Sequence, residues 1–439
     1  MKLLRFAFLI GVVVLPAVAQ QLDPSQSAST DDSMPAALAG RGVRRMPLDE
    51  RATANYVTGG IAITQMYTDN IEFSTTGQLS DLSYSIDPHI ALDYSSPKLS
   101  YDAAVAAGFV VNRKLNERNQ ATQNGAFDLS YHLSQFWVLR LDDSFRNTTG
   151  LWSGSDSAGV SSVSAGLGPV QQPNRSLFTF GHFRENTVLA ELSAQFSATA
   201  YGGIRGEQTH TWFPSGASDP VVGALYGGNS YSAEMFYNHQ FSRRHWGGVT
   251  VRAGRYDLSQ SLGRTDTGSL LFMYAVALRP TMTLSFFGGP QLSVTSASDA
   301  VTPVPGFQRR LWSPNAGAVF SSETRKTSES LSFTHGVSNG GGLASAVTLD
   351  SADAQVAYRI ARRVELGPGF AYGESTPIVS SAKFRSYSAR IQSTLRLGNC
   401  SFSSGYSWDH RSAEASDTAA AANSVWVAFS FNFIRPIGR

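Results

Sequence analysis

The sequence has 439 residues, a formal net charge of +2 and 15% charged residues, whereas soluble domains usually have roughly 25%. Lys2 and Arg5 lie in a leader that we expect to be removed, so the mature chain would be neutral, which argues against an electrostatic nucleic-acid binder. Cys400 is the single cysteine, which excludes an internal disulfide framework and a cysteine-based metal site.

The N-terminus has the pattern of an export signal. Lys2 and Arg5 precede an apolar run from residue 6 to residue 15, and the small residues Ala17 and Ala19 frame a cleavage site. We therefore predict a signal peptide at 1–19, in preference to a membrane anchor, because the run is short and Pro16 follows it. Residues 20–55 are polar and lack a strong period, which predicts a short disordered periplasmic tail. No later apolar run approaches the length of a membrane helix.

From residue 56 onward the chain alternates between apolar and polar residues, which is the period of a β-strand. In 187–197, for example, Val188, Ala190 and Leu192 alternate with Glu191 and Ser193. The pattern predicts an all-β fold with strands near 56–68, 79–94, 98–111, 124–133, 136–147, 187–197, 201–212, 229–241, 245–258, 269–279, 282–295, 311–321, 328–336, 344–360, 363–373, 384–397, 400–410 and 424–433. That is about eighteen strands, with sixteen as the alternative count.

The links between these strands alternate between short and long. Short links centre on 95–97, 134–135, 199–200, 243–244, 279–281, 325–326, 362 and 399. Long links include 148–186, 213–228, 259–268, 296–310, 374–383 and 411–423, and a shorter one lies at 337–343. A transmembrane antiparallel β-barrel has tight periplasmic turns at one rim and longer extracellular loops at the other. We therefore assign 56–439 to an outer-membrane β-barrel with both termini on the periplasmic side.

The last predicted strand, SVWVAFSFNF at 424–433, has one strongly apolar face. Its valines and phenylalanines share one parity, and Ser424, Trp426, Ala428, Ser430 and Asn432 share the other. In a barrel the first face would meet lipid and the second a water-filled interior. Aromatic residues near strand ends predict a girdle at the lipid boundary, formed by Tyr84, Tyr94, Trp137, Trp212, Tyr231, Trp246, Tyr256, Tyr372, Trp408 and Phe433.

Charged residues on the polar strand faces are the candidate functional residues. Inside a barrel they would face water and bias which solutes pass, or they would only solvate the wall and pair with one another. These lumen-lining candidates are Asp102, Asp128, Arg140, Asp142, Glu191, Glu234, Arg252, Arg390 and Arg396. The link 148–186 could enter the lumen as a constriction or remain a surface loop.

The sequence carries no strong signal for catalysis, a cofactor or a metal. Gly336, Ser338 and Gly340 match the G-x-S-x-G pattern, but that pattern marks a nucleophile only between a strand and a helix, and no helical pattern follows here. Asp409 and His410 are adjacent, so on a strand they would point to opposite faces. We therefore do not expect an enzyme.

Several segments, among them SPKLSYDAAVAAGFVVN, NQATQNGAFDLSYHLSQFWVLRLDDSF and the ending SVWVAFSFNFIRPIGR, resemble bacterial outer-membrane β-barrel proteins of the porin or exopolysaccharide-associated type. The resemblance implies a barrel without catalytic residues, located in the outer membrane as a multi-pass protein. Barrels of this kind usually end on an aromatic residue, whereas here Phe433 is followed by six more residues.

We expect a porin-like channel for small hydrophilic solutes. Two alternatives stay open: a barrel for exopolysaccharide export, and a non-conducting barrel that is structural or displays surface loops. The expected partners are outer-membrane lipid, the barrel assembly machinery through the C-terminal strand, and further copies in a homo-oligomer.

Overall fold

The computed structural model describes residues 55–149, 182–213, 218–219, 223–258, 263–297, 308–338, 346–379, 383–414 and 418–437. The predicted signal peptide at 1–19 and the predicted tail at 20–55, except for its last residue, lie outside these ranges. So does most of the link 148–186. Within the described ranges, no helix is long and apolar enough to cross a membrane.

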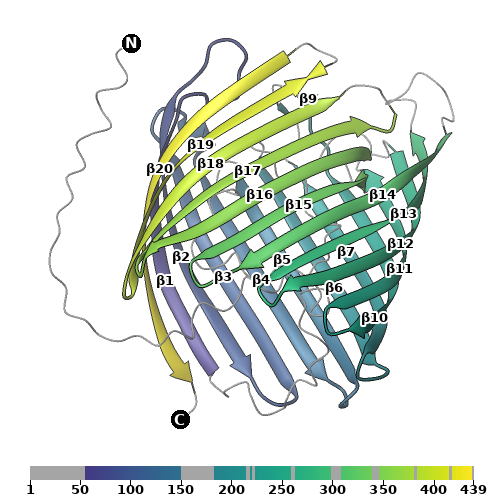
Figure 1. Ribbon diagram of the computed structural model, residues 1–439. Helices are drawn as coiled ribbons and strands as arrows, with labels where there is room; N and C mark the ends of the chain where they lie inside the picture. Colours follow the sequence, from purple (N-terminus) through teal and green to yellow (C-terminus); the bar gives the residue numbers. More distant parts are fainter. Residues whose placement is uncertain are drawn as a thin grey trace.

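Almost all of the described chain is β-strand (Figure 1). The first strands are β1 (Asn55–Thr68), β2 (Asp81–Ser95), β3 (Leu99–Asn112), β4 (Gln120–His132), β5 (Trp137–Thr149), β6 (His182–Gln195) and β7 (Ala200–Trp212). The later ones are β10 (Gly228–Ser242), β11 (His245–Leu258), β12 (Gly263–Arg279), β13 (Met282–Ala297), β14 (Gln308–Glu323), β15 (Thr327–Ser338), β16 (Val347–Ala361), β17 (Val364–Pro377), β18 (Phe384–Leu397), β19 (Cys400–Ala413) and β20 (Thr418–Ile437). A short hairpin, β8 (Ser218–Asp219) and β9 (Gly223–Ala224), and a 3-10 turn, η2 (Asn116–Arg118), lie in links.

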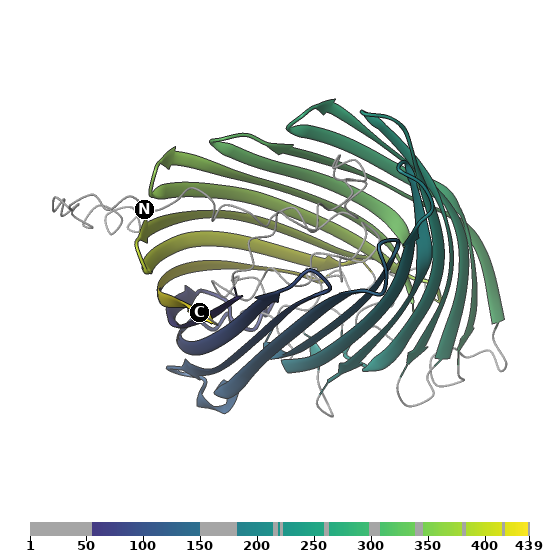
Figure 2. The ribbon, with the colours of Figure 1, turned by 90° about the horizontal axis from the view of Figure 1, so that it is seen from below.

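Eighteen of these strands form one closed antiparallel sheet (Figures 1 and 2). Each strand pairs with its neighbour in the chain, β7 pairs with β10, and β1 pairs with both β2 and β20. Closure leaves no free sheet edge, so the backbone groups of the first and last strands are satisfied by each other. The structure confirms the predicted β-barrel and its strand count of eighteen.

The link lengths follow the predicted alternation in part. Several predicted long links are shorter than expected, among them 378–383 after β17, and two of them are as short as the turns after β4 and β6. The links after β11 and β19 cover only 259–262 and 414–417, because β12 begins at Gly263 and β20 at Thr418. The start of β12 lacks apolar alternation, and cross-strand polar contacts hold it instead. Arg255 on β11 donates to Asp266 at 2.8 Å, and the hydroxyls of Thr265 and Thr295 lie 2.9 Å apart. A period of two in hydrophobicity could not detect a strand of this kind.

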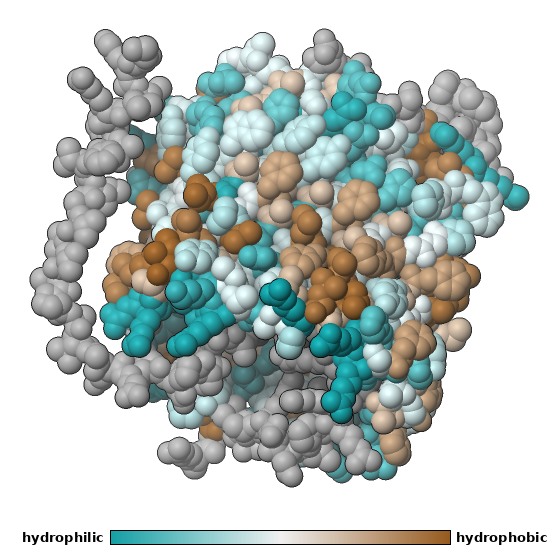
Figure 3. Space-filling view, in the orientation of Figure 1, coloured by the Kyte–Doolittle hydropathy of each residue, from teal (hydrophilic) through white to brown (hydrophobic). Residues whose placement is uncertain are grey.

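The two faces of β20 differ in polarity as the sequence predicts, and they also differ in exposure. Val425 and Val427 are 50% and 52% exposed, whereas Ser424 and Ser430 are 4% and 3% exposed. The strand registers carry this alternation around the sheet, so large apolar side chains point outward from nearly every strand. Figure 3 shows apolar side chains gathered across the middle of the outer wall, with hydrophilic side chains above and below them. This is the reverse of a soluble protein, whose apolar side chains are inside.

The closing strand does not end at Phe433. β20 continues to Ile437, and β1 pairs with it from Asn55 opposite Ile437 to Thr68 opposite Ser424. The ring of Phe433 covers Gly59 on β1, where a Cβ would lie only 2.5 Å from the ring. The residues after Phe433 therefore extend the strand that closes the barrel, which the sequence pattern did not indicate.

Eight of the ten predicted girdle residues lie on the outward face by register: Tyr84, Tyr94, Trp137, Trp212, Tyr231, Tyr372, Trp408 and Phe433. Trp246 and Tyr256 lie on the inward face of β11, which corrects the prediction for these two. Trp246 is 2% exposed and packs against Ala275, and Tyr256 packs against a cluster that contains Val337. Both were assigned to the girdle because they lie near strand ends. Their positions, however, have the opposite parity to the outward Val249 and Val251.

Candidate functional site

The inward face of the barrel carries the candidate site. Counted from the outward apolar residues, the strand registers place all nine predicted lumen candidates on this face: Asp102, Asp128, Arg140, Asp142, Glu191, Glu234, Arg252, Arg390 and Arg396. The registers also bring most of them together into two cross-strand rows, which the sequence did not reveal.

The first row, here called the aspartate row, consists of four aspartates on four adjacent strands. Asp93 on β2 lies opposite Asp102 on β3, Asp102 opposite Asp128 on β4, and Asp128 opposite Asp142 on β5. Like charges directly opposite each other in a sheet are destabilising. A row of this kind therefore needs positive charge or water beside it.

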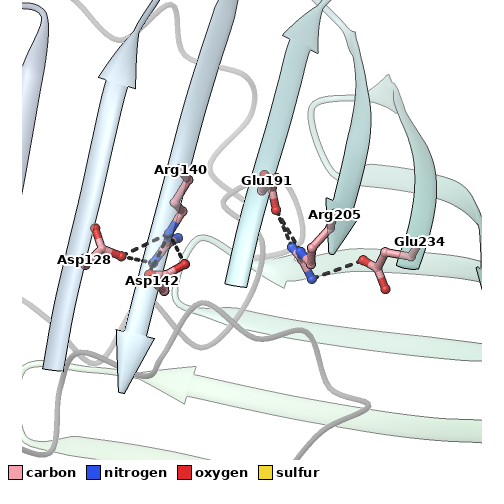
Figure 4. A network of polar contacts seen from close by, with 6 residues as sticks. All are labelled: Asp128, Arg140, Asp142, Glu191, Arg205 and Glu234. Atoms are coloured by element: carbon pink, nitrogen blue, oxygen red, sulfur yellow. Dashed lines mark hydrogen bonds and ion pairs between the residues drawn. The ribbon is translucent and has the colours of Figure 1, made fainter. Parts of the chain in front are cut away.

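Arg140 supplies positive charge to the inner half of the aspartate row (Figure 4). Its Nη2 and Nε donate to Asp128 Oδ2 at 2.5 and 3.0 Å, and its Nε lies 3.2 Å from Asp142 Oδ2. Arg140 is two residues before Asp142 on the same strand, so both side chains point inward. One guanidinium thus neutralises one of the two carboxylates that it binds.

The second row, here called the alternating row, changes the sign of its charge at each strand. It runs from Arg140 on β5 through Glu191 on β6, Arg205 on β7 and Glu234 on β10 to Arg252 on β11, each directly opposite the next. Opposite charges in cross-strand pairs stabilise a sheet by roughly 0.2–1 kcal/mol each. The row therefore stabilises the wall that it lines.

Arg205 is the centre of the alternating row (Figure 4). Its Nη2 and Nε donate to Glu191 Oε2 at 2.6 and 2.9 Å, and its Nη1 lies 3.1 Å from Glu234 Oε1. The three side chains are only 14–18% exposed. The guanidinium also lies 5.8 Å from the ring centre of Phe236, within the range of a cation–π contact. As with Arg140, two carboxylates share one arginine.

Sequence reasoning missed Arg205 and Glu207, the two charged inward residues of β7. The outward positions of this strand are mostly glycine and polar residues, so its apolar face is weak: Gly202, Ile204, Gly206, Gln208, His210 and Trp212. Ile204 and Trp212, which are exposed, are the outward residues whose parity could have indicated that Arg205 and Glu207 point inward.

Inward charges are distributed unequally around the barrel. By register, β2–β11 carry ten inward carboxylates and four arginines: Asp81, Asp87, Asp93, Asp102, Asp128, Asp142, Glu185, Glu191, Glu207 and Glu234, with Arg140, Arg146, Arg205 and Arg252. In the described parts of β12, β13 and β15, the inward positions are mostly Ser, Thr, Gly and apolar residues, without a charged residue between the turns. The remaining arc, β14 and β16–β19, carries five arginines and four carboxylates: Arg309, Arg359, Arg390, Arg396 and Arg411, with Glu323, Asp353, Glu365 and Asp409.

The charged residues of this last arc, β14 and β16–β19, are more loosely paired than those of the alternating row. Arg396, near the end of β18, lies 3.3 Å from Glu365 and its side chain is 60% exposed. Arg411 lies over the ring of Phe73 at 4.7 Å, and Arg309 donates to the carbonyl oxygen of Ile378 at 2.7 Å. These arginines are therefore held by aromatic and backbone partners as well as by carboxylates.

The described residues show no arrangement of His, Cys, Asp and Glu side chains that would hold a metal ion. Gly336 and Ser338 of the G-x-S-x-G pattern belong to the end of β15, and Gly340 lies outside the described residues. Asp409 points inward and His410 outward, because they are consecutive on β19. The site therefore offers fixed charges and hydrogen-bonding groups.

Comparisons with known proteins give structural likenesses only. No protein-family model and no curated protein matches the sequence. Among solved structures, the chain is similar to Pseudomonas aeruginosa OccK2 (OpdF) in complex with glucuronate, at 10% identity and a TM-score of 0.45 over 87% of this chain and 98% of that one. It is also similar to Acinetobacter baumannii OccAB3, at 8% identity and a TM-score of 0.45 over 87% and 99%. A third likeness is to Pseudomonas aeruginosa OccK9 (OpdG), at 11% identity and a TM-score of 0.44 over 87% and 98%.

Proposed function

We propose that this protein is an outer-membrane β-barrel whose water-filled interior lets small hydrophilic solutes diffuse across the membrane. The observation that carries the proposal is the opposite polarity of the two faces of each strand. On β20, Val425 and Val427 point outward beside a wall of apolar side chains, while Ser424 and Ser430 point inward. A closed sheet with this polarity suits lipid outside and water inside.

The strand count supports an aqueous channel. Barrels of sixteen to eighteen strands are wide enough that side chains do not fill them, in contrast to eight-stranded barrels. The inward charges support the same conclusion, because Arg140, Arg205 and their carboxylates would be costly in a dry interior. In water their field biases which solutes enter.

Polysaccharide export is the main competing function, and it would require aromatic rings exposed along the lumen, on which sugars stack. Several inward aromatic residues of the described strands are instead packed against the wall. Phe287 lies over Gly317 and Trp426 over Gly405, with each ring less than 3 Å from where a Cβ of that glycine would be. Trp246 packs against Ala275 and Met273. This packing favours the channel for small solutes.

Insertion and assembly are part of the proposal. We expect the barrel assembly machinery to recognise the C-terminal strand, β20, because this strand closes the barrel against β1. Outer-membrane lipid would then contact the outward apolar side chains. A homo-oligomer remains an expectation from the sequence.

Single-channel recording on protein extracted from membranes tests the function. The folded barrel, identified by heat-modifiable migration on gels, should give discrete conductance steps in planar bilayers. A folded barrel that never conducts would support a structural or loop-display role. Normal conductance together with loss of surface polymer on gene deletion would favour export.

A further inference from the structure

The inward charges lie on two opposite walls of the barrel, and the walls differ in sign. The strands β2–β7, with most of the inward carboxylates, face the strands β14–β19 across the interior (Figures 1 and 2). On the first wall the carboxylates outnumber the arginines, and on the second the arginines are slightly in excess. The inward residues of the described strands therefore carry an excess of negative formal charge.

Ion pairing does not remove this excess on the acidic wall. Arg140 is shared by Asp128 and Asp142, and Arg205 is shared by Glu191 and Glu234. The formal charges of Arg140, Asp128 and Asp142 therefore sum to one net negative charge, whereas Arg252, opposite Glu234, offsets the second glutamate of the Arg205 group. The guanidinium donors are directed at these carboxylates, so little of their positive charge is presented to a passing solute.

The aspartate row begins close to one rim of the barrel. Asp93 lies near the end of β2 and Asp102 near the start of β3, beside the short link that joins the two strands. Both residues are exposed. From there the row continues to Asp128 and Asp142 in the middle of β4 and β5. The row therefore forms an acidic track from the rim into the interior.

We propose that the channel prefers small cations over anions, and that the aspartate row provides this preference. The inference rests on the proposed channel function and names the class of solute that the channel favours. Cations near the acidic track are attracted, whereas anions are repelled from it, because a row of fixed carboxylates raises the local concentration of counter-ions. The arginines of the opposite wall, Arg390 and Arg396 among them, keep anions on their own side.

The reversal potential of the barrel in a gradient of potassium chloride tests the proposal. The unmodified protein should show the sign of a potassium-selective channel. In the double variant Asp93→Asn with Asp102→Asn, the ratio of potassium to chloride permeability should fall by about twofold or more, since two carboxylates leave the track. Arg390→Gln on the opposite wall should leave the sign unchanged and raise the ratio.

Asp143→Asn is the matched control. Asp143 follows Asp142 on β5, points outward and accepts a hydrogen bond from Asn186 at 2.8 Å, so it should not affect the ratio. Heat-modifiable migration verifies that each variant is folded, and Asp93→Asn alone replaces the double variant if the latter fails to fold. Chloride selectivity, or a ratio unchanged by the loss of Asp93 and Asp102, would overturn the cation preference while leaving the channel intact. A folded barrel without any conductance would overturn the channel itself, and the preference with it.

Discussion

The inner and outer faces of the barrel wall are built from the same strands, yet their residues follow opposite rules. On the outer face of β20, Val427 is half exposed. The residues before and after it, Trp426 and Ala428, point to the inner face, which also carries Ser430 and the two charged rows. A side chain's environment here depends on the parity of its position, because successive residues of a strand point to opposite sides. Substitutions at adjacent residues should therefore have very different effects.

The largest difference is expected between Val427→Arg and Ala428→Arg, two adjacent positions in the middle of β20. Arginine on the lipid face near the middle of the membrane should cost about 2–4 kcal/mol in the free energy of unfolding. The same residue on the inner face can reach water and should cost much less. Urea unfolding in lipid vesicles, followed by heat-modifiable migration, measures both. Equal costs would show that the two faces do not differ in environment.

A smaller difference is expected within the inner face. Arg205 is 14% exposed and binds two glutamates, whereas Arg396 is 60% exposed and binds one. Arg205→Gln removes the guanidinium that Glu191 and Glu234 share, and should lower the free energy of unfolding by about 2 kcal/mol. Arg396→Gln should change it by less than about 1 kcal/mol, as for other exposed ion pairs.

The same urea titration measures this second comparison, with Arg205→Lys as the control. Lysine keeps the charge but cannot form the forked contacts to both carboxylates, so its effect should be intermediate. An Arg205→Gln variant as stable as the unmodified protein would show that the alternating row does not stabilise the wall.

The smallest effect concerns two tryptophans, and it is spectroscopic. Trp408 points outward from β19, whereas Trp246 points inward from β11 and is almost fully buried. Brominated lipids should quench the fluorescence of Trp408, so Trp408→Phe should reduce the quenchable fraction. Trp246→Phe should instead reduce the fraction of the emission that brominated lipid does not quench. The reverse result would mean that the inward assignment of Trp246 is wrong.

The sequence predicted the barrel well, because alternation is a local property. Every one of the eighteen strands was expected close to its observed place, and the parity of Val427 and Phe431 on β20 agrees with the structure. Strand ends were less predictable where polar contacts replace alternation, as at Asp266 on β12. The extension of β20 to Ile437 was missed for a different reason: it depends on pairing with β1, where Asn55 lies opposite Ile437, and β1 is far away in the sequence.

The charged rows could not be predicted, because they depend on register. Nine inward charges were identified by parity, but parity does not show that Arg140 lies opposite Glu191 or that Asp102 lies opposite Asp128. Register is set by turn geometry and by the stagger of the closed barrel. Arg205 was missed because the glycines on the outward face of β7 hide its parity.

Cysteine accessibility along β20 tests most directly whether water is inside and lipid outside. In a Cys400→Ser background, single cysteines at positions 425, 427, 428 and 432 would be labelled in lipid vesicles with a charged, membrane-impermeant thiol reagent. The account predicts high labelling at the inward Ala428 and Asn432, whose side chains are partly exposed, and low labelling at the outward Val425 and Val427. Equal labelling of both sets, or preferential labelling at Val425 and Val427, would contradict it.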